Sequence, residues 1–144
     1  MKILSLLLLT IFLGKGCDSE TKQDIDGAVI EYTANTRGFY QKITVQQQTV
    51  SVSKDRDGNE KAVVEKISDA DWKELIAAFQ TVNLNELPNL KAPTDKRKYD
   101  GAAIGNLKVT FKDSVYETSG FDNGYPPEEI SKLVNKVVSL VKKD

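Results

Sequence analysis

Residues 28–67, AVIEYTANTRGFYQKITVQQQTVSVSKDRDGNEKAVVEKI, indicate the fold more directly than any other part of the chain. Apolar side chains recur at every second position in several runs, which is typical of strands with one face on a core. The positions of this alternation are Ile30 and Tyr32, then Phe39, Gln41, Ile43 and Val45, then Val50 and Val52, then residues 63–67; Gln41 is a polar exception. The segments NTRG (35–38), QQQ (46–48) and DRDGN (55–59) separate the runs, and an Asp-Gly pair suits a tight turn. We therefore predict three or four antiparallel strands joined by short turns.

The period of the apolar residues changes after residue 67. One apolar face at helical spacing is formed by Trp72, Leu75, Ile76, Phe79 and Val82. Ser68 is suited to cap the N-terminus of this helix, with Asp69 and Asp71 in its first turn. Segment 84–90 then repeats leucine at every third position around Pro88, which favours a short 3₁₀ piece. We predict a helix over 68–82 followed by that turn.

The C-terminal part repeats the strand and helix patterns. Apolar residues alternate from Ile104 to Phe111, and Asp113 with Ser114 predicts a two-residue hairpin turn into a strand over 115–119. Two prolines, 126 and 127, suit the first turn of a last helix. Its apolar face consists of Ile130, Leu133, Val134, Val137, Val138 and Val141. The predicted order is β-β-β-(β)-α-β-β-α, which gives an α+β domain over residues 27–144: an antiparallel sheet of five or six strands with two helices on one face.

The composition excludes several classes of function. The 144 residues contain 20 Lys and Arg against 21 Asp and Glu, a balance that does not suit nucleic-acid binding. The chain has no histidine and a single cysteine, Cys17. Zinc, copper and haem sites therefore lack their usual ligands, and Ser-His and Cys-His nucleophiles are excluded. We predict neither a metal site nor another cofactor.

Four oxygen-bearing side chains crowd into one short segment, at Asp55, Asp57, Asn59 and Glu60. Calcium binds through oxygen ligands, but the spacing here is not that of an EF-hand loop, because Gly58 is the fourth residue of the segment and not the sixth. We interpret the segment as a hairpin turn.

The first seventeen residues, MKILSLLLLTIFLGKGC, join a positive start to an apolar run over 3–13 and then to small residues and Cys17. The apolar run is about half the length that spans a bilayer, and its flanks are those of a signal peptide. Leu13, Gly14, Gly16 and Cys17 resemble the lipobox of bacterial lipoprotein precursors, from which Lys15 departs.

The lipobox resemblance implies cleavage before Cys17 and attachment of a lipid to that residue. Residues 1–16 would then be the signal peptide, and residues 17–26 a lipid anchor and polar tether. The implied location is the cell envelope, and we expect the outer membrane, on its periplasmic or surface side. The alternative is an ordinary secretory signal followed by an unrelated cysteine.

Four further segments resemble the small α+β lipoproteins of unassigned function found in Gram-negative envelopes. They are RGFY (37–40), KAPT (91–94), YDGA (99–102) and FDNGYPPEE (121–129). Together they extend over most of the predicted domain. The resemblance implies a fold and a location and no mechanism.

Two polar loops carry the candidate binding residues. Residues 91–101, KAPTDKRKYDG, form a longer connection than the usual one of about 4–6 residues, and such loops are often functional. A local basic patch is formed there by Lys91, Lys96, Arg97 and Lys98 beside Tyr99, and it is suited to meet an anionic partner. We expect Lys96, Arg97 and Lys98 to be exposed and to contribute little to stability. The second loop, 120–127, adds Asp122, Asn123 and Tyr125, while Phe121 is expected to pack inward.

These observations favour a non-catalytic binding module in the envelope. Its expected partners are the membrane, through a lipid on Cys17, and an envelope protein or an anionic glycan. A second hypothesis is an inhibitor of a secreted enzyme, such as a lysozyme or a protease, that acts through one protruding loop. A third is a glycan hydrolase in which Asp100 and Asp122 form a carboxylate pair.

Overall fold

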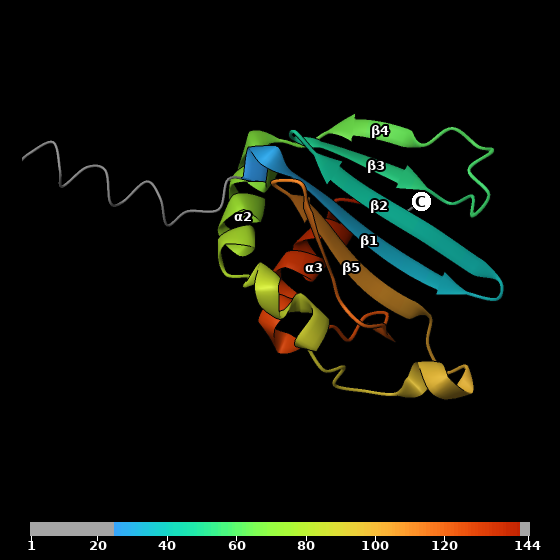
Figure 1. Cartoon of the computed structure of the whole chain (residues 1–144). Coiled ribbons are helices and arrows are strands. Elements are labelled where there is room, and N and C mark those ends of the chain that lie inside the picture. Colours follow the sequence, from blue (N-terminus) through green and yellow to red (C-terminus); the bar gives the residue numbers. More distant parts are fainter. Residues whose placement is uncertain (1–24, 142–144) are drawn as a thin grey trace, which may run out of the picture.

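A computed structural model describes residues 25–141 as an antiparallel sheet with helices packed against it (Figure 1). The strands are β1 (Ala28–Thr36), β2 (Phe39–Gln46), β3 (Thr49–Ser53), β4 (Val63–Lys66), β5 (Ile104–Phe111), β6 (Ser114–Glu117) and β7 (Phe121–Asp122). Six of them follow the order β4-β3-β2-β1-β5-β6, and the two-residue β7 pairs with β5. The helices are α2 (Asp69–Gln80) and α3 (Ser131–Ser139), and the 3₁₀ turns are η1 (Ile25–Gly27), η2 (Leu84–Asn89), η3 (Lys96–Tyr99) and η4 (Glu128–Ile130). The predicted α+β class and antiparallel sheet are confirmed.

The alternation along the strands places one face of the sheet in the core. On β1, Ala28, Ile30, Tyr32 and Ala34 are buried, and the inward residues of β2 and β5 join them. Helix α3 packs on β1 and β2, and α2 packs on α3. The opposite face is polar, and Glu31 lies there between Lys42 and Lys108, with oxygen-to-nitrogen distances of 3.0 Å and 3.8 Å.

Helix α2 follows the predicted pattern closely. Ser68 caps its N-terminus, where the side-chain oxygen accepts a hydrogen bond from the backbone N–H of Asp71. Leu75 and Phe79 are fully buried, whereas Trp72 and Ile76 lie at the margin of the core. The predicted apolar face is therefore correct, and its most deeply buried residues are Leu75 and Phe79, one and two turns after Trp72.

The last helix is shorter than predicted at its start. Pro126 and Pro127 lead into the 3₁₀ turn η4, and the α-helix begins at Ser131. Leu133, Val134 and Val137 are buried, but Val138 is 42% exposed, because it lies away from the stripe that faces the sheet. Residues 142–144 lie outside the described part of the chain.

Two local predictions need correction. The hairpin between β5 and β6 turns at Lys112 and Asp113, both with positive φ, because Ser114 already pairs with Phe111. The predicted strand over 63–67 is present as β4, but the expected packing of one of its faces on the core is wrong: residues 63–66 are all exposed at the edge of the sheet, and only Ile67, directly after the strand, is buried. The predicted turn at residues 46–48 is confirmed by the positive φ of Gln47 and Gln48.

Candidate functional site

The site is built around Asp122, whose carboxylate is fully buried. The short strand β7 places it there, because Ile104 pairs with Asp122 and Gly105 with Phe121. This pairing brings the second predicted loop against the first, residues 91–101, which we call the basic loop. Figure 1 shows the basic loop passing below the sheet toward the start of β5, with η3 just before that strand.

Both oxygens of the Asp122 carboxylate accept hydrogen bonds from the basic loop. One oxygen accepts from the backbone N–H of Lys96 at 2.7 Å and from the hydroxyl of Thr94. The other accepts from the backbone N–H of Arg97 at 2.9 Å and from its guanidinium at 3.2 Å. The Arg97 guanidinium also donates to the carbonyl of Thr94 at 2.8 Å. One side chain from β7 therefore fixes the course of the basic loop.

The same contacts keep this carboxylate ionised. Burial on its own raises the pKa of Asp122, but the hydrogen bonds from Thr94, Arg97 and Lys96 outweigh it and hold that pKa well below its usual range. A carboxyl group of this kind does not hold a proton near neutral pH, so it cannot serve as the general acid of a glycan hydrolase. Asp100 lies on the surface with a left-handed backbone, as the C-cap of η3.

A second set of contacts fixes the strand that carries Asp122. Phe121 is buried, as predicted, and its ring lies 6.2 Å from that of Tyr32. The Tyr32 hydroxyl donates to the side-chain oxygen of Asn123 at 2.6 Å, and burial raises the pKa of Tyr32 to about 12. Gly105 must be glycine here, because a Cβ would lie 2.8 Å from the Tyr32 hydroxyl and 2.9 Å from the Phe121 ring.

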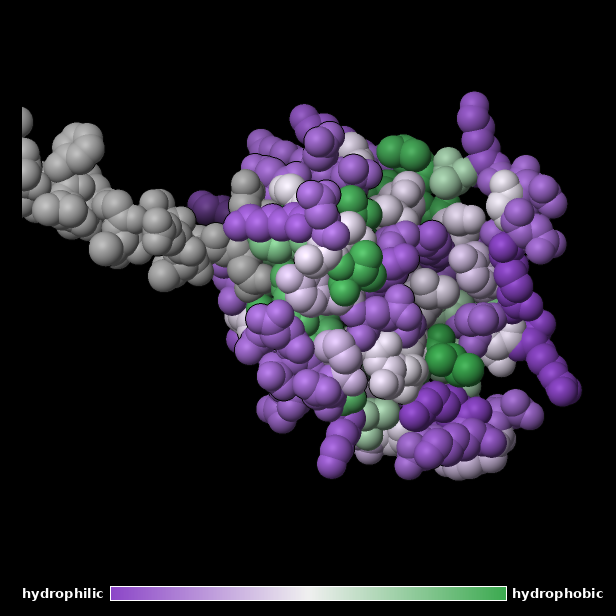
Figure 2. Space-filling model, in the orientation of Figure 1, coloured by the Kyte–Doolittle hydropathy of each residue, from purple (hydrophilic) through white to green (hydrophobic). Residues whose placement is uncertain are grey.

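The outer side of the basic loop presents cationic and aromatic groups. The ammonium of Lys96 lies 4.6 Å from the centre of the Tyr125 ring, a cation–π contact that joins the two predicted loops. Tyr99 is 72% exposed. Lys98 is exposed too, and its ammonium lies 3.5 Å from the Asp95 carboxylate. We call Lys96, Lys98, Tyr99 and Tyr125 the loop surface. In Figure 2, hydrophilic side chains cover the region where η3 lies in Figure 1.

The structure thus brings all seven predicted binding residues of this domain together, but it divides them into two groups. Lys98, Tyr99 and Tyr125 are exposed, and the half-buried Lys96 places its ammonium against the exposed Tyr125 ring. Arg97, Asp122 and Asn123 use their side chains within the fold, and the Arg97 side chain is only 16% exposed. The expectation that Lys96, Arg97 and Lys98 are all exposed is therefore wrong for Arg97, and it holds fully only for Lys98, because Lys96 is half-buried.

Sequence reasoning did not identify Thr94, Gly105 or Tyr32 as part of this arrangement. Each contributes through a contact with a residue far away in the sequence. No local pattern marks such residues, although Gly120, directly before the FD pair, lies where a Cβ would come within 3.0 Å of the Ile104 side chain.

The acidic segment 55–59 forms the predicted turn, with a positive φ at Gly58. The Asp55 carboxylate accepts hydrogen bonds from the backbone N–H groups of Asp57 at 3.0 Å and Glu60 at 2.7 Å, which lower the pKa of Asp55. Among residues 25–141, no group of three or more acidic, histidine or cysteine side chains is placed to hold a metal ion.

Comparisons of the chain with protein-family models, curated proteins and solved structures give no match. In the described part of the chain, no helix has the length and apolarity needed to cross a membrane. Cys17 and the predicted signal peptide lie outside the described residues.

Proposed function

We propose that this protein is an envelope lipoprotein, anchored through Cys17, whose domain is a non-catalytic module that binds an acidic partner protein through the loop surface. The observation that carries the proposal is the fixing of the basic loop by the buried carboxylate of Asp122. A long polar loop normally loses much conformational freedom on binding, which weakens the complex. This loop is already ordered in the free protein.

The chemistry of the loop surface favours an anionic partner. Two ammonium groups and two exposed tyrosine rings lie on it, and the Asp95 carboxylate pairs with Lys98 and Arg97 at its edge. Tyrosines are enriched at protein interfaces because a large rigid ring gives much contact area for little loss of entropy. Acidic side chains on the partner would add charge-assisted hydrogen bonds to the lysines.

The test is affinity capture from solubilised membranes with the full-length chain. We expect the double substitution Lys96→Ser and Lys98→Ser to abolish capture of the partner, and capture by the parent to weaken as salt is raised. Arg97 is kept, because its loss would disturb the loop itself. The matched control is Lys73→Ser with Lys132→Ser, which removes the same charge from exposed positions on α2 and α3. Equal capture by both double variants would contradict the proposal.

The anchor is tested separately. We expect Cys17→Ser to move the protein out of the membrane fraction or to leave its signal uncut. A Cys17→Ser protein that is processed like the parent and stays in the membrane fraction would show that no lipid on this residue holds it there.

One observation favours the inhibitor hypothesis as a second candidate. The basic loop projects beyond the sheet (Figure 1) and is rigidly supported, as is typical of loops that fill the active site of an enzyme. An inhibitor captures one enzyme tightly and abolishes its activity. A binding module of an envelope assembly leaves its partner active, so an activity measurement on the captured protein separates the two.

A further inference from the structure

The edge strand β4 is a second surface, on the other side of the molecule from β5 and β7. Every residue from 60 to 66 is exposed, and Val63 and Val64 are 62% and 63% exposed. Within residues 25–141 the strand ends the sheet beyond β3, so one row of its backbone groups has no neighbouring strand in this part of the chain. An exposed apolar edge of this kind is a template for pairing with another strand.

The backbone contacts show which residues of β4 present this free row. The N–H of Ile67 donates to the carbonyl of Gln48 at 2.8 Å, so the backbone groups of Ile67 face the β3 side. These groups alternate in direction along a strand, so those of Val63 and Glu65 also face β3. Within β4, the backbone groups of Val64 and Lys66 therefore point outward. If the alternation continues to Ala62, directly before β4, its backbone groups take the same direction when a strand is added.

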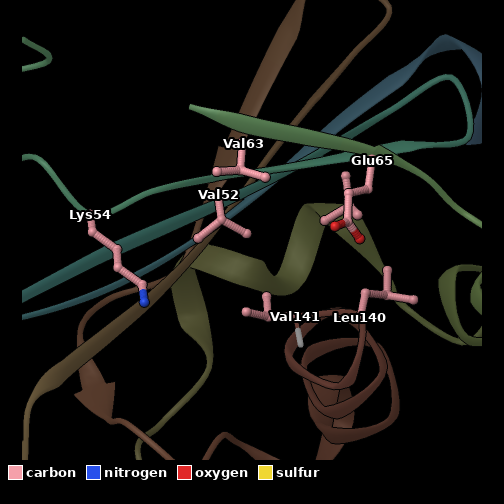
Figure 3. A pocket seen from close by; sticks show the side chains of 7 residues that line it. Val52, Lys54, Val63, Glu65, Leu140 and Val141 are labelled. Atoms are coloured by element: carbon pink, nitrogen blue, oxygen red, sulfur yellow. The ribbon is translucent and has the colours of Figure 1, made fainter. Parts of the chain in front are cut away.

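An apolar hollow of about 200 Å³ lies beside this edge. Figure 3 shows Val52 and Val63, from neighbouring strands, on the side that faces Leu140 and Val141 at the end of the last helix. Lys54 and Glu65 lie at its margin. A strand added to β4 would extend this apolar surface and cover part of it.

We propose that β4 pairs in an antiparallel manner with β4 of a second copy of this chain, with Val63 opposite Val63 on the two-fold axis. The segment Glu60–Lys66, EKAVVEK, is self-complementary in this register. Lys61 lies opposite Glu65 of the other copy, and Glu60 lies opposite Lys66. Cross-strand pairs of opposite charge stabilise a sheet, and like charges destabilise it.

The outward backbone groups select the same register. Ala62 of one copy lies opposite Val64 of the other, and both present their backbone groups to the partner, so they form hydrogen-bonded pairs on either side of the axis. A shift by two residues in one direction sets Ala62 against Lys66 and loses both charge pairs. A shift by two residues in the other direction places Val63 against Lys61 and also loses them. Only the proposed register keeps both kinds of charge pair and also places Val63 opposite Val63. Such self-matching is expected of a symmetric isologous contact.

The first experiment is sedimentation velocity of the full chain in detergent over a range of protein concentrations. We expect a reversible dimer for the parent. We expect monomer for Val63→Lys, because two ammonium groups would then face each other across the axis. Val115→Lys is the matched control, since Val115 is 59% exposed on β6 at the opposite edge. Residues 1–24 are the same in both variants, so any association through that segment affects both equally. A monomeric parent, or a dimer that survives Val63→Lys, would overturn the proposal.

The second experiment tests the register. In a full chain carrying Cys17→Ser, Val63→Cys supplies the only thiol, and we expect it to form an intermolecular disulfide under mild oxidation. Facing residues at a non-hydrogen-bonded pair have Cβ atoms about 4.5–5.5 Å apart, within or close to the range that a disulfide needs. Val64→Cys is equally exposed but faces Ala62, so it should cross-link much more slowly. Faster cross-linking of Val64→Cys would contradict the proposed pairing. Equal melting midpoints of the reduced variants exclude unfolding as the cause.

Discussion

The loop between β3 and β4 and the basic loop between η2 and β5 use the same device in different ways. Each is polar, and each wraps the backbone around one carboxylate that accepts N–H groups. Asp55 belongs to the loop that it organises and lies near the surface. Asp122 comes from β7, is fully buried and fixes a loop more than twenty residues earlier in the chain.

The difference shows how burial changes the importance of one kind of contact. Around Asp55, water can replace each hydrogen bond that is lost, so the contribution of the carboxylate is small. Around Asp122, removal of the carboxylate leaves two backbone N–H groups, one hydroxyl and the Arg97 guanidinium without their partner. Unsatisfied polar groups away from water are costly, so the basic loop depends on its carboxylate much more strongly.

The largest effect should therefore come from Asp122→Ala, with Asp55→Ala as its counterpart. We expect the first to lower the melting midpoint by on the order of 10 °C and the second by about 2 °C or less. Differential scanning calorimetry of both variants provides the measurement. Similar losses at the two positions would mean that the basic loop does not depend on its buried anchor.

Acid should act on the two loops in the same direction and to different extents. The pKa of each carboxyl is lower in the folded protein than in the unfolded chain. Their contributions to stability are therefore fully present above the ordinary aspartate pKa of about 4 and are lost as the pH falls below it. We expect the melting midpoint to decrease as the pH is lowered from about 5 to about 2, a range that brackets the ordinary aspartate pKa. The fall should be clearly smaller in Asp122→Asn than in Asp55→Asn.

A smaller contrast is expected between the two arginines of these loops. Arg97 is largely buried and donates to Asp122 and Thr94, whereas Arg56 is exposed and donates to Asn35 and to the carbonyl of Thr36. Arg97→Ala should lower the melting midpoint by about 5 °C, and Arg56→Ala by about 2 °C or less. Proteolysis should separate them too, because the first variant should be cut faster within residues 91–101. Equal protection of the two loops in both variants would contradict this assignment.

The smallest effect on stability is expected from Lys96→Ser combined with Lys98→Ser. Lys98 is an exposed charge with a surface pair to Asp95, and Lys96 contacts the exposed Tyr125 ring. Such exposed contacts contribute little to the free energy of unfolding, so the melting midpoint should change by about 2 °C or less. A loss as large as that of Arg97→Ala would place these lysines in the framework of the loop and not on its binding surface.

Much of the fold could be predicted because it depends on neighbours in the sequence. Alternation along 28–52 gave the first three strands, and Ser68 marked the start of α2 at the observed residue. The Asp-Gly pair marked the turn after β3. Strand alternation, helix caps and tight turns all involve residues within a few positions of one another, so a single sequence contains the information.

The binding residues were predicted as a set, but their roles were not. Lys96, Arg97 and Lys98 look alike in the sequence, yet Arg97 alone turns inward to Asp122. In the same way, Val63 and Val64 look like core residues, but β4 is an edge strand and both are exposed. A pattern of residue types does not show which strand ends a sheet or which charge meets a buried partner.

The sequence by itself therefore determined the order of the elements other than β7, the α+β class and the position of the two polar loops. The tertiary structure decided that β7 pairs with β5, and that pairing carries Asp122 into the interior beneath the basic loop. The physical reason is the range of the interactions. Local backbone preferences act within a few residues, whereas burial and the ionisation of Asp122 depend on contacts across more than twenty.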